Sequence, residues 1–273
     1  MNAYLTVLSS DSYLLGVLAL YKSLLETKTN YPFYVAITDD LSKESIDVLK
    51  NNNINLIKLD EKIDMPEKIR NKNCKFGYSQ WNNTLQKLGI FQLEQFNKIV
   101  YIDSDMMILR NIDELFTKEH MSAVVAGALM PGREMWKELN SGVMVIEPKN
   151  NLGNNIAKMI YSVSLKKEYF GDQDLIQEYY YDWSKNKELN LDHKYNVFIG
   201  DLEYYCKNEG YSIKESSRCI SIIHFIGIKK PWMLSRMEIF RMILSLIKNN
   251  KINTLKIYIS YFRILNRIKK EQN

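Results

Sequence analysis

Two carboxylates stand one residue apart where an apolar segment ends. Asp103 and Asp105 follow the run Ile99-Val100-Tyr101-Ile102, whose composition is typical of a buried strand. A buried strand tolerates ionised side chains only where a cation pairs with them. The pair therefore predicts a divalent metal site at a strand end, with the metal carrying a phosphate. An isolated Asp-x-Asp is also common in solvated turns, so the surrounding residues must decide between the two.

Two further polar groups are expected beside this pair. Asn140 precedes a predicted strand at 141–146, and His224 follows another at 220–223. In a parallel sheet, these positions would meet at the carboxyl edge, where ligands bind. Two carboxylates and one imidazole suit Mn²⁺ or Mg²⁺ better than zinc. A single histidine after a strand is more often structural, so the argument for a ligand rests on this convergence.

The elements that would position these groups alternate between strand and helix. Strands are predicted at 4–8, 33–37 and 54–59, with a helix at 13–25 capped by Asp11 or Ser12 and a helix from Ser42 to about 51. Such alternation is typical of parallel βαβ units. Further on, the pattern predicts helices at 79–95, 156–164, 235–249 and 253–270, while residues 165–220 are mixed and polar. The expected fold class is α/β.

Glycine-rich phosphate-binding motifs are absent. The sequence contains neither Gly-x-Gly-x-x-Gly nor a Walker-type loop, which argues against dinucleotide redox chemistry and P-loop hydrolysis. A bound phosphate would then have to be held by a metal and by basic side chains.

Bulk composition describes an ordinary globular protein of 273 residues, 46% of them hydrophobic. Its three cysteines, Cys74, Cys206 and Cys219, indicate neither a disulfide framework nor a zinc cluster. The first residues lack the pattern of a signal peptide, and no segment approaches the roughly 20 apolar residues that span a bilayer. We therefore expect a cytoplasmic protein.

The positive charge is concentrated at the C-terminal end. Residues 228–273 carry eleven lysines and arginines against two glutamates, a net charge of +9, whereas the rest of the chain carries −4. The two helices predicted from 235 onward combine these cations with aromatic and aliphatic residues. Such helices either lie on anionic membranes, here at the inner face, or pack on the domain with solvated lysines. Nucleic-acid binding is not expected, because no recognition motif accompanies the charge.

Seven motifs occur in the order found in the glycogenin-like glycosyltransferases of family 8, and the sequence resembles that family over about residues 3–232. They are Leu8-Ser9-Ser10-Asp11-Ser12-Tyr13, Lys87-Leu88, Asp103-Ser104-Asp105, Asn111-Ile112-Asp113-Glu114-Leu115-Phe116, Asn140-Ser141-Gly142-Val143, Gly171-Asp172-Gln173, and His224-Phe225-Ile226-Gly227 with Lys230-Pro231-Trp232. The resemblance implies a GT-A fold, Rossmann-like, with a mixed and mostly parallel central sheet and a basic helical extension. It further implies a catalytic domain at 1–232, made of a UDP-binding half at about 1–116 and a sugar and acceptor half at about 117–232, followed by the tail at 233–273.

The resemblance also implies roles for individual residues. The metal would be bound by Asp103, Asp105 and His224, the uridine by Leu8, Ser9, Ser10 and Tyr13, and the ribose by Ser104. Gly227 and Lys230 would contact the diphosphate. The transferred sugar would be surrounded by Lys87, Asn140, Ser141, Asp172 and Gln173, of which Lys87, Asn140, Asp172 and Gln173 would take part in catalysis.

The implied activity is retaining transfer of a hexose, glucose or galactose, from a UDP-sugar to a glycan or lipid-linked glycan, with Mn²⁺ or Mg²⁺ as cofactor. Two alternatives remain: a self-glucosylating primer, and a haloacid-dehalogenase-type phosphatase that would use the first Asp as nucleophile. The primer would need an acceptor tyrosine before the last strand, and here Glu203 takes that position with Tyr204 and Tyr205 beside it. A homo-oligomer is compatible with any of these activities.

Overall fold

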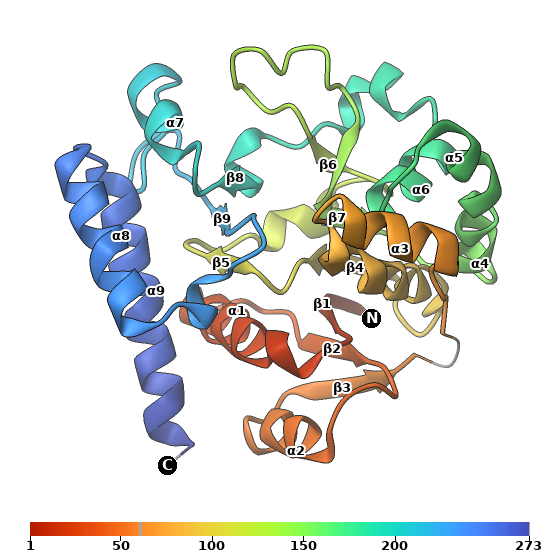
Figure 1. Ribbon diagram of the computed structural model, residues 1–273, viewed down its shortest axis with the longest axis horizontal. Coiled ribbons are helices and arrows are strands. Elements are labelled where there is room, and N and C mark those ends of the chain that lie inside the picture. The colour runs from red at the N-terminus through yellow and green to blue at the C-terminus, as the bar shows by residue number, and fades with distance from the viewer. Residues whose placement is uncertain (60–61, 273) are drawn as a thin grey trace.

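The computed structural model describes residues 1–59 and 62–272, and a six-stranded sheet lies at its centre (Figure 1). Its order is β3-β2-β1-β4-β7-β6. The strands are β1 (Asn2–Leu8), β2 (Phe33–Ile37), β3 (Asn55–Lys58), β4 (Lys98–Ile102), β6 (Ala123–Val125) and β7 (Leu139–Ile146). Strands β1 to β4 pair in parallel, whereas β7 runs antiparallel to both β4 and β6. The expected mixed, mostly parallel sheet is therefore present.

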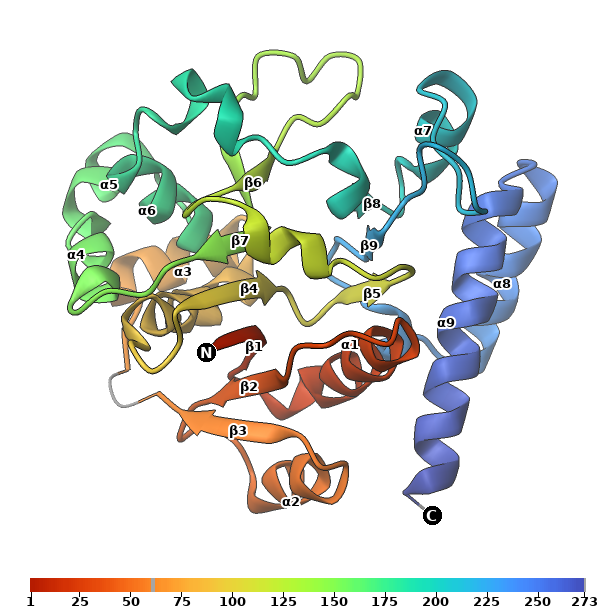
Figure 2. The ribbon, with the colours of Figure 1, turned by 180° about the vertical axis from the view of Figure 1, so that it is seen from behind.

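The sheet is covered on both faces, which explains why its strands are almost continuously apolar. Along β1, Tyr4 and Leu8 belong to a core shared with α1 (Leu14–Glu26), while Ala3 and Leu5 belong to a second core. The second core is formed with the 3₁₀ segment Ser79–Gln92, α4 (Leu152–Ala157) and α6 (Asp172–Tyr179). Figure 2 shows the same arrangement from behind, with α2 (Lys43–Asn51) next to β3 at the sheet edge.

A small second sheet carries His224. It is built from β5 (Met106–Ile108), β9 (Ile222–His224) and β8 (Val197–Phe198) in the order β5-β9-β8. Met106 pairs with His224 across antiparallel strands, and the Phe225 N–H donates to the Asp105 carbonyl at 2.9 Å. This pairing brings two distant segments of the chain together, so His224 reaches Asp105 from β9 and not from the central sheet.

Several local predictions were wrong in detail. Asn140 lies inside β7 near its start, and β7 is antiparallel, so Asn140 meets the end of β4 without belonging to a carboxyl edge. The segment predicted as a helix at 79–95 is a 3₁₀ helix, and the helix expected at 156–164 is divided into α4 and α5 (Ile160–Lys166). A 3₁₀ turn at Asp11–Tyr13 precedes α1, which has no side-chain cap.

Three short helices lie in polar stretches where the apolar periodicity did not predict them: α3 (Glu67–Lys75), α6 and α7 (Leu202–Asn208). By contrast, the predicted cap at Ser42 is confirmed, because its hydroxyl accepts from the Ser45 N–H at 3.2 Å at the start of α2. The Asp11 carboxylate, which was expected to cap the first helix, instead accepts from the Ser42 N–H at 3.1 Å.

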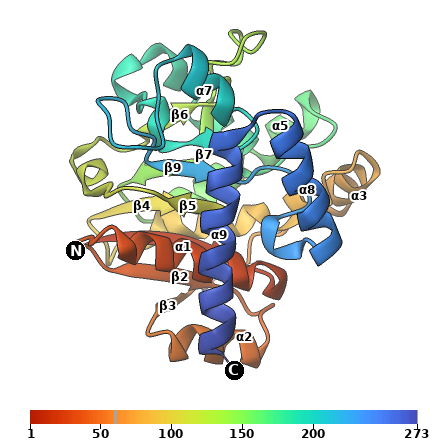
Figure 3. The ribbon, with the colours of Figure 1, turned by 90° about the vertical axis from the view of Figure 1, so that its left-hand side faces the viewer.

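The two C-terminal helices differ in how they pack. Helix α9 (Ile252–Glu271) buries Ile257, Tyr261 and Ile264 in the core shared with α1, and it runs across the side of the molecule in Figure 3. Helix α8 (Arg236–Lys248) buries only Leu246 among its described residues. Within the described part of the chain, no helix is both long enough and apolar enough to span a membrane.

Candidate functional site

A cavity of about 1270 Å³ opens where β1, β4 and β9 end and β7 begins. All but one of the residues predicted to bind metal, nucleotide or sugar line it: Ser9, Ser10, Tyr13, Lys87, Asp103, Ser104, Asp105, Asn140, Ser141, Asp172, Gln173, His224, Gly227 and Lys230. The exception is Leu8, whose side chain is fully buried in the core on the α1 side. Because side chains alternate along a strand, it is Val7 that faces the cavity.

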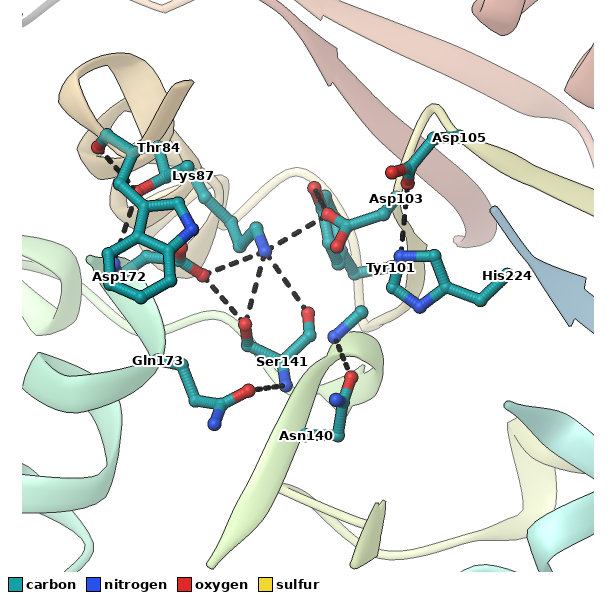
Figure 4. A network of polar contacts seen from close by, with 12 residues as sticks. Thr84, Lys87, Tyr101, Asp103, Asp105, Asn140, Ser141, Asp172, Gln173 and His224 are labelled. Carbon is teal, nitrogen blue, oxygen red and sulfur yellow. Dashed lines mark hydrogen bonds and ion pairs between the residues drawn. The ribbon is translucent and has the colours of Figure 1, made fainter. Parts of the chain in front are cut away.

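The predicted metal ligands come together on the cavity wall. Ligand atoms of Asp103, Asp105 and His224 all lie within 4.8 Å of one another (Figure 4). Asp103 and Asp105 are placed by the turn between β4 and β5, and His224 ends β9. Gly142 permits this approach, because a Cβ there would lie only 2.6 Å from the Met106 methyl carbon and 3.0 Å from the His224 ring.

A chain of amides fixes the tautomer of His224. The Asn140 Oδ1 accepts from the Gly142 N–H at 2.9 Å, so the atom of Asn196 that contacts this oxygen at 2.7 Å must be its donating Nδ2. The Asn196 Oδ1 then faces the His224 Nδ1 at 2.9 Å and accepts a hydrogen bond from its N–H. This leaves the His224 Nε2 lone pair directed at the Asp105 carboxylate 3.2 Å away, an arrangement that requires a cation or a proton between them. The donor set thus fits a divalent metal.

Lys230 is a second cationic partner of Asp105. Its Nζ lies 2.6 Å from the Asp105 Oδ2 and donates to the Phe225 carbonyl at 3.0 Å, and its side chain is 6% exposed. Burial alone would raise the pKa of Asp105, but His224 and Lys230 outweigh burial and hold that pKa well below its usual range. Asp105 is therefore ionised at any physiological pH.

Lys87 connects Asp103, one of the predicted metal ligands, to Asp172 across the cavity. Its Nζ lies 3.0 Å from the Asp103 Oδ1 and 2.7 Å from the Asp172 Oδ2, and it donates to the Ser141 carbonyl at 3.2 Å (Figure 4). Burial would lower the pKa of Lys87, but the charges of Asp103 and Asp172 raise it above its ordinary value. Lys87 is therefore a permanent cation between two carboxylates.

Asp172 is held firmly in place at the start of α6. Its N–H donates to the Thr84 Oγ1 at 3.1 Å, and its Oδ2 accepts from the Ser141 Oγ at 2.8 Å as well as from Lys87. The next side chain, Gln173, accepts from the Ser141 N–H at 3.2 Å through its Oε1. Two adjacent residues thus point into the cavity with their orientation set by β7.

Tyr13 faces the cavity from the other end. Its ring meets the Trp232 ring edge-on at 5.6 Å, and the Trp232 Nε1 donates to the Ser12 carbonyl at 2.8 Å. Gly16 makes room for this contact, because a Cβ there would lie 2.6 Å from the Trp232 ring. Burial and the charge of Asp105 raise the pKa of Tyr13 to about 12, so its phenol is neutral at physiological pH.

Sequence reasoning missed three residues that orient the site. Asn196 orients His224, Thr84 anchors the start of α6, and the Tyr101 hydroxyl donates to the Asp103 Oδ1 at 2.5 Å. Tyr101 lies in β4, two residues before Asp103, so alternation continued from the strand into the turn could have identified it. Asn196 lies in a mixed, polar segment and Thr84 in a segment predicted as a helix, and in neither does a local signal distinguish the residue.

The family model described as Glycosyl transferase family 8 matches residues 4–235. The chain belongs to this family. The match covers every residue of the cavity described above, and the fold is the GT-A fold that the resemblance implied. Family membership also makes the phosphatase alternative unnecessary.

Over the aligned residues, curated relatives are between 26% and 30% identical to the chain. A putative UDP-glucuronate:xylan alpha-glucuronosyltransferase 3 from Arabidopsis thaliana is 29% identical over 239 residues, covering 86% of this chain and 35% of the relative. Glycogenin-1 from Caenorhabditis elegans is 27% identical over 249 residues, covering 85% of this chain and 51% of the relative. The chain thus spans about a third to a half of the length of such relatives.

Solved structures agree on the fold at lower identity. The galactosyltransferase LgtC, in complex with donor and acceptor sugar analogs, superposes with a TM-score of 0.63 at 14% identity, covering 98% of this chain and 96% of that one. The glycosyltransferase GlyE of Streptococcus pneumoniae gives a TM-score of 0.56 at 17% identity, covering 99% of this chain and 64% of that one.

Proposed function

We propose that the protein is a metal-dependent retaining glycosyltransferase that moves a hexose, glucose or galactose, from a UDP-sugar to a glycan, free or lipid-linked. The observation that carries the proposal is the meeting of Asp103, Asp105 and His224 within 4.8 Å on the wall of one cavity, with Asp172 connected to this group through Lys87. The diphosphate of a nucleotide sugar needs a metal ion, which Asp103, Asp105 and His224 could hold. The hydroxyls of the sugar need polar side chains such as Lys87 and Asp172.

In this proposal, different residues of the cavity bind the uridine, the ribose and the diphosphate. Ser9, Ser10 and Tyr13 hold the uridine, with the Tyr13 ring against uracil, and Ser104 contacts the ribose. Asp103, Asp105 and His224 would hold Mn²⁺, or Mg²⁺ as the alternative, and the ion would stabilise the negative charge that grows on the departing diphosphate. Lys230 supplies a further positive charge to the same group, and the positive φ of 108° at Gly227 lets the backbone come close to it.

The hexose would lie against Lys87, Asn140, Ser141, Asp172 and Gln173. Lys87 at 2.7 Å and Ser141 at 2.8 Å both contact the Asp172 Oδ2, so the electron pairs of this oxygen are engaged and the carboxylate is a weaker nucleophile. A carboxylate held in this way is better suited to orient sugar hydroxyls than to attack carbon. The contacts therefore favour attack by the acceptor on the face from which UDP leaves, over a covalent intermediate on Asp172.

The charges in the cavity favour a neutral donor sugar over a uronic acid. Among the described residues, four Lys and Arg side chains line the cavity, and each is paired with a carboxylate: Lys87 with Asp103 and Asp172, Arg133 with Asp201, Lys167 with Asp174, and Lys230 with Asp105. A glucuronate carboxylate would have to share a cation that already has an anionic partner. A hexose needs no such exchange.

The primer alternative has little support from the positions of its candidate acceptors. The Glu203 carboxylate accepts from the Thr254 N–H at 2.9 Å at the start of α9, so it serves as an anchor for that helix. Tyr205 is 1% exposed, and its hydroxyl accepts from the Leu129 N–H at 3.3 Å. Neither Tyr204 nor Tyr205 lines the cavity. A separate acceptor is the better hypothesis, and intact protein mass after incubation with UDP-sugars should stay constant.

The decisive experiment is a screen of UDP-sugars for Mn²⁺-dependent release of UDP. We expect one neutral hexose donor to be turned over and Asp105→Ala to lose metal-dependent UDP binding by at least about a hundredfold, because a ligand of the ion is removed. Asp47→Ala, on the exposed side of α2, is the matched control and should bind UDP normally. Unchanged UDP binding in Asp105→Ala would refute the metal assignment.

A second proposal concerns α8, which we infer to lie on an anionic membrane surface. Four of its side chains form an exposed apolar stripe at helical spacing, with exposed fractions of 59% for Met237, 57% for Phe240, 50% for Leu244 and 54% for Ile247. Arg236, Arg241 and Lys248 flank the stripe and would pair with lipid headgroups. Helix α9 takes no part, since its apolar face is buried. The three cysteines are free, which agrees with a place at the reducing, cytoplasmic face of that membrane.

Liposome flotation of the full chain tests the membrane proposal. Deleting the tail would remove α9 from the core, so substitutions are the sharper tool. We expect the double variant Phe240→Ser, Leu244→Ser to lose binding to vesicles that contain phosphatidylserine. Leu165→Ser changes an exposed leucine of α5, on the other side of the molecule, and should float like the wild type. Equal flotation of all three proteins would exclude α8 as the contact.

A further inference from the structure

A second, smaller hollow of about 290 Å³ adjoins the main cavity. It lies between α5 and α6, and the two hollows share three lining residues, Glu138, Lys167 and Asp174. Asp174 follows Asp172 by two residues on the first turn of α6. The two hollows therefore meet at the ion pair of Lys167 with Asp174, next along α6 to Asp172 and Gln173. In Figure 1, α5 and α6 lie on the side of the molecule opposite α8 and α9.

The combined space is larger than one donor needs. Pockets for single small ligands measure about 300–1,000 Å³, and the main cavity alone holds about 1270 Å³. Room remains for acceptor units after the nucleotide sugar is bound. The second hollow shares no lining residue with the uridine end at Ser9 and Tyr13.

The side chains along this path combine exposed aromatic rings with paired charges. Trp136, 42% exposed, faces the main cavity and donates from its Nε1 to the Glu138 Oε2 at 3.2 Å. Tyr181, 72% exposed, lines the far end. Aromatic faces pack against the C–H faces of sugar rings, while carboxylates and amides bind their hydroxyls.

The charges identify the kind of glycan. Lys166 is paired with Glu178 at 2.6 Å, and Lys167 is paired with Asp174. Both lysines of the hollow are therefore neutralised, while Glu138 adds a negative charge. An acidic glycan would be repelled by this arrangement, whereas a neutral one would find both donors and acceptors.

We propose that the path from Gln173 to Tyr181 is an acceptor subsite that binds a neutral oligosaccharide of at least two sugar units. The proposal rests on the transferase function proposed above and deepens it by naming the acceptor class. The sugar unit that receives the hexose lies beside Asp172 and Gln173, and the following units lie against Glu138 and Tyr181.

Binding to a printed array of neutral and acidic glycans tests the subsite without any donor. We expect the wild type to bind neutral oligosaccharides, with weak or no signal for monosaccharides and for sialylated or phosphorylated glycans. Tyr181→Ala and Trp136→Ala should each lose about tenfold in affinity, the scale of one aromatic contact. Tyr161→Ala removes another exposed tyrosine, on α5 but outside both hollows, and should bind like the wild type. Binding to acidic glycans alone, or equal binding by all variants, would overturn the proposal.

Transfer kinetics then separate the subsite from the reaction centre. With an oligosaccharide found on the array, Tyr181→Ala should raise the acceptor KM about tenfold and leave kcat within about twofold of the wild type. A subsite that is merely structural would instead lower kcat together with stability. If UDP-sugars are not turned over at all but the array result holds, the proposed function fails while the glycan site stands. If turnover occurs with no preference for acceptor length, the subsite fails alone.

Discussion

The Lys230 Nζ lies 2.6 Å from the Asp105 Oδ2, in a place where the same carboxylate also faces the His224 Nε2 at 3.2 Å. A single buried carboxylate thus has both a fixed cationic partner and the geometry of a metal ligand. A bound metal ion and Lys230 would share the negative charge of Asp105. Lys230 should therefore weaken metal binding to the free protein while strengthening binding of the diphosphate. Lys230 then links the two ligands, since its charge finds a second anionic partner only when the nucleotide is bound.

This relationship predicts opposite effects of one substitution on two ligands. In Lys230→Met, the affinity for Mn²⁺ without nucleotide should rise about threefold to tenfold, because a competing positive charge is removed. The affinity for UDP in the presence of Mn²⁺ should fall by a similar factor. Titration calorimetry measures both. Lys229→Met is the matched control, since Lys229 pairs with the exposed Glu238 outside the cavity. A loss of Mn²⁺ affinity in Lys230→Met would show that the lysine supports the metal site.

Lys87 should contribute more to stability than an ordinary lysine. Its removal leaves Asp103 and Asp172 without their buried counter-ion, so Lys87→Met should lower the free energy of unfolding by about 3–5 kcal/mol in chemical denaturation. Adding Asp172→Asn to this variant should restore part of the loss, because one uncompensated charge disappears. Lys167→Met breaks a half-exposed pair at the rim and should cost at most about 1 kcal/mol. Equal losses in the two single variants would contradict the role of burial.

Glu203 should hold α9 on the domain. Its Oε1 accepts from the Thr254 N–H at 2.9 Å, and its Oε2 accepts from the Asn253 Nδ2 at 3.1 Å, which satisfies free donors in the first turn of α9. Glu203→Ala should lower the free energy of unfolding by about 1–2 kcal/mol and speed amide hydrogen exchange in the first turns of α9. Glu215→Ala, at an exposed loop position, should change neither. Faster exchange throughout the molecule would indicate general destabilisation and no anchoring role.

The extent to which the sequence determines this site differs from residue to residue. Asp103 and Asp105 could be found from the apolar strand before them, and His224 from the strand that it ends. The antiparallel direction of β7 could not be predicted from the sequence, because Leu139–Ile146 is buried throughout and carries the same apolar pattern in either direction. Asn196 remained hidden for a different reason. Its role depends on a contact with His224 across 28 positions of the chain, which no local pattern encodes.

The C-terminal helices show the same limit at the level of packing. Both have basic and apolar residues in similar proportion, and their sequences alone left membrane contact and packing on the domain as alternatives. The structure assigns packing to α9, whose Tyr261 is fully buried, and leaves the apolar stripe of α8 exposed. Which of two amphipathic helices covers a core depends on the shape of the core, here the surface of α1.

The last prediction concerns pH and a histidine far from the cavity chemistry. The His120 Nδ1 accepts from the Glu147 N–H at 3.0 Å, and its Nε2 faces the Tyr180 hydroxyl at 2.8 Å. The ring is largely buried, and this burial lowers the pKa of His120 from 6.5 to about 4. The unfolded chain therefore binds this proton more readily, and the free energy of unfolding should fall by up to about 3 kcal/mol as the pH drops from 6.5 to 4. His120→Asn keeps an acceptor near the Glu147 N–H without a titrating group. Its stability, measured by denaturation across this range, should decline less steeply than that of the wild type; parallel curves would contradict the assignment of this pH dependence to His120.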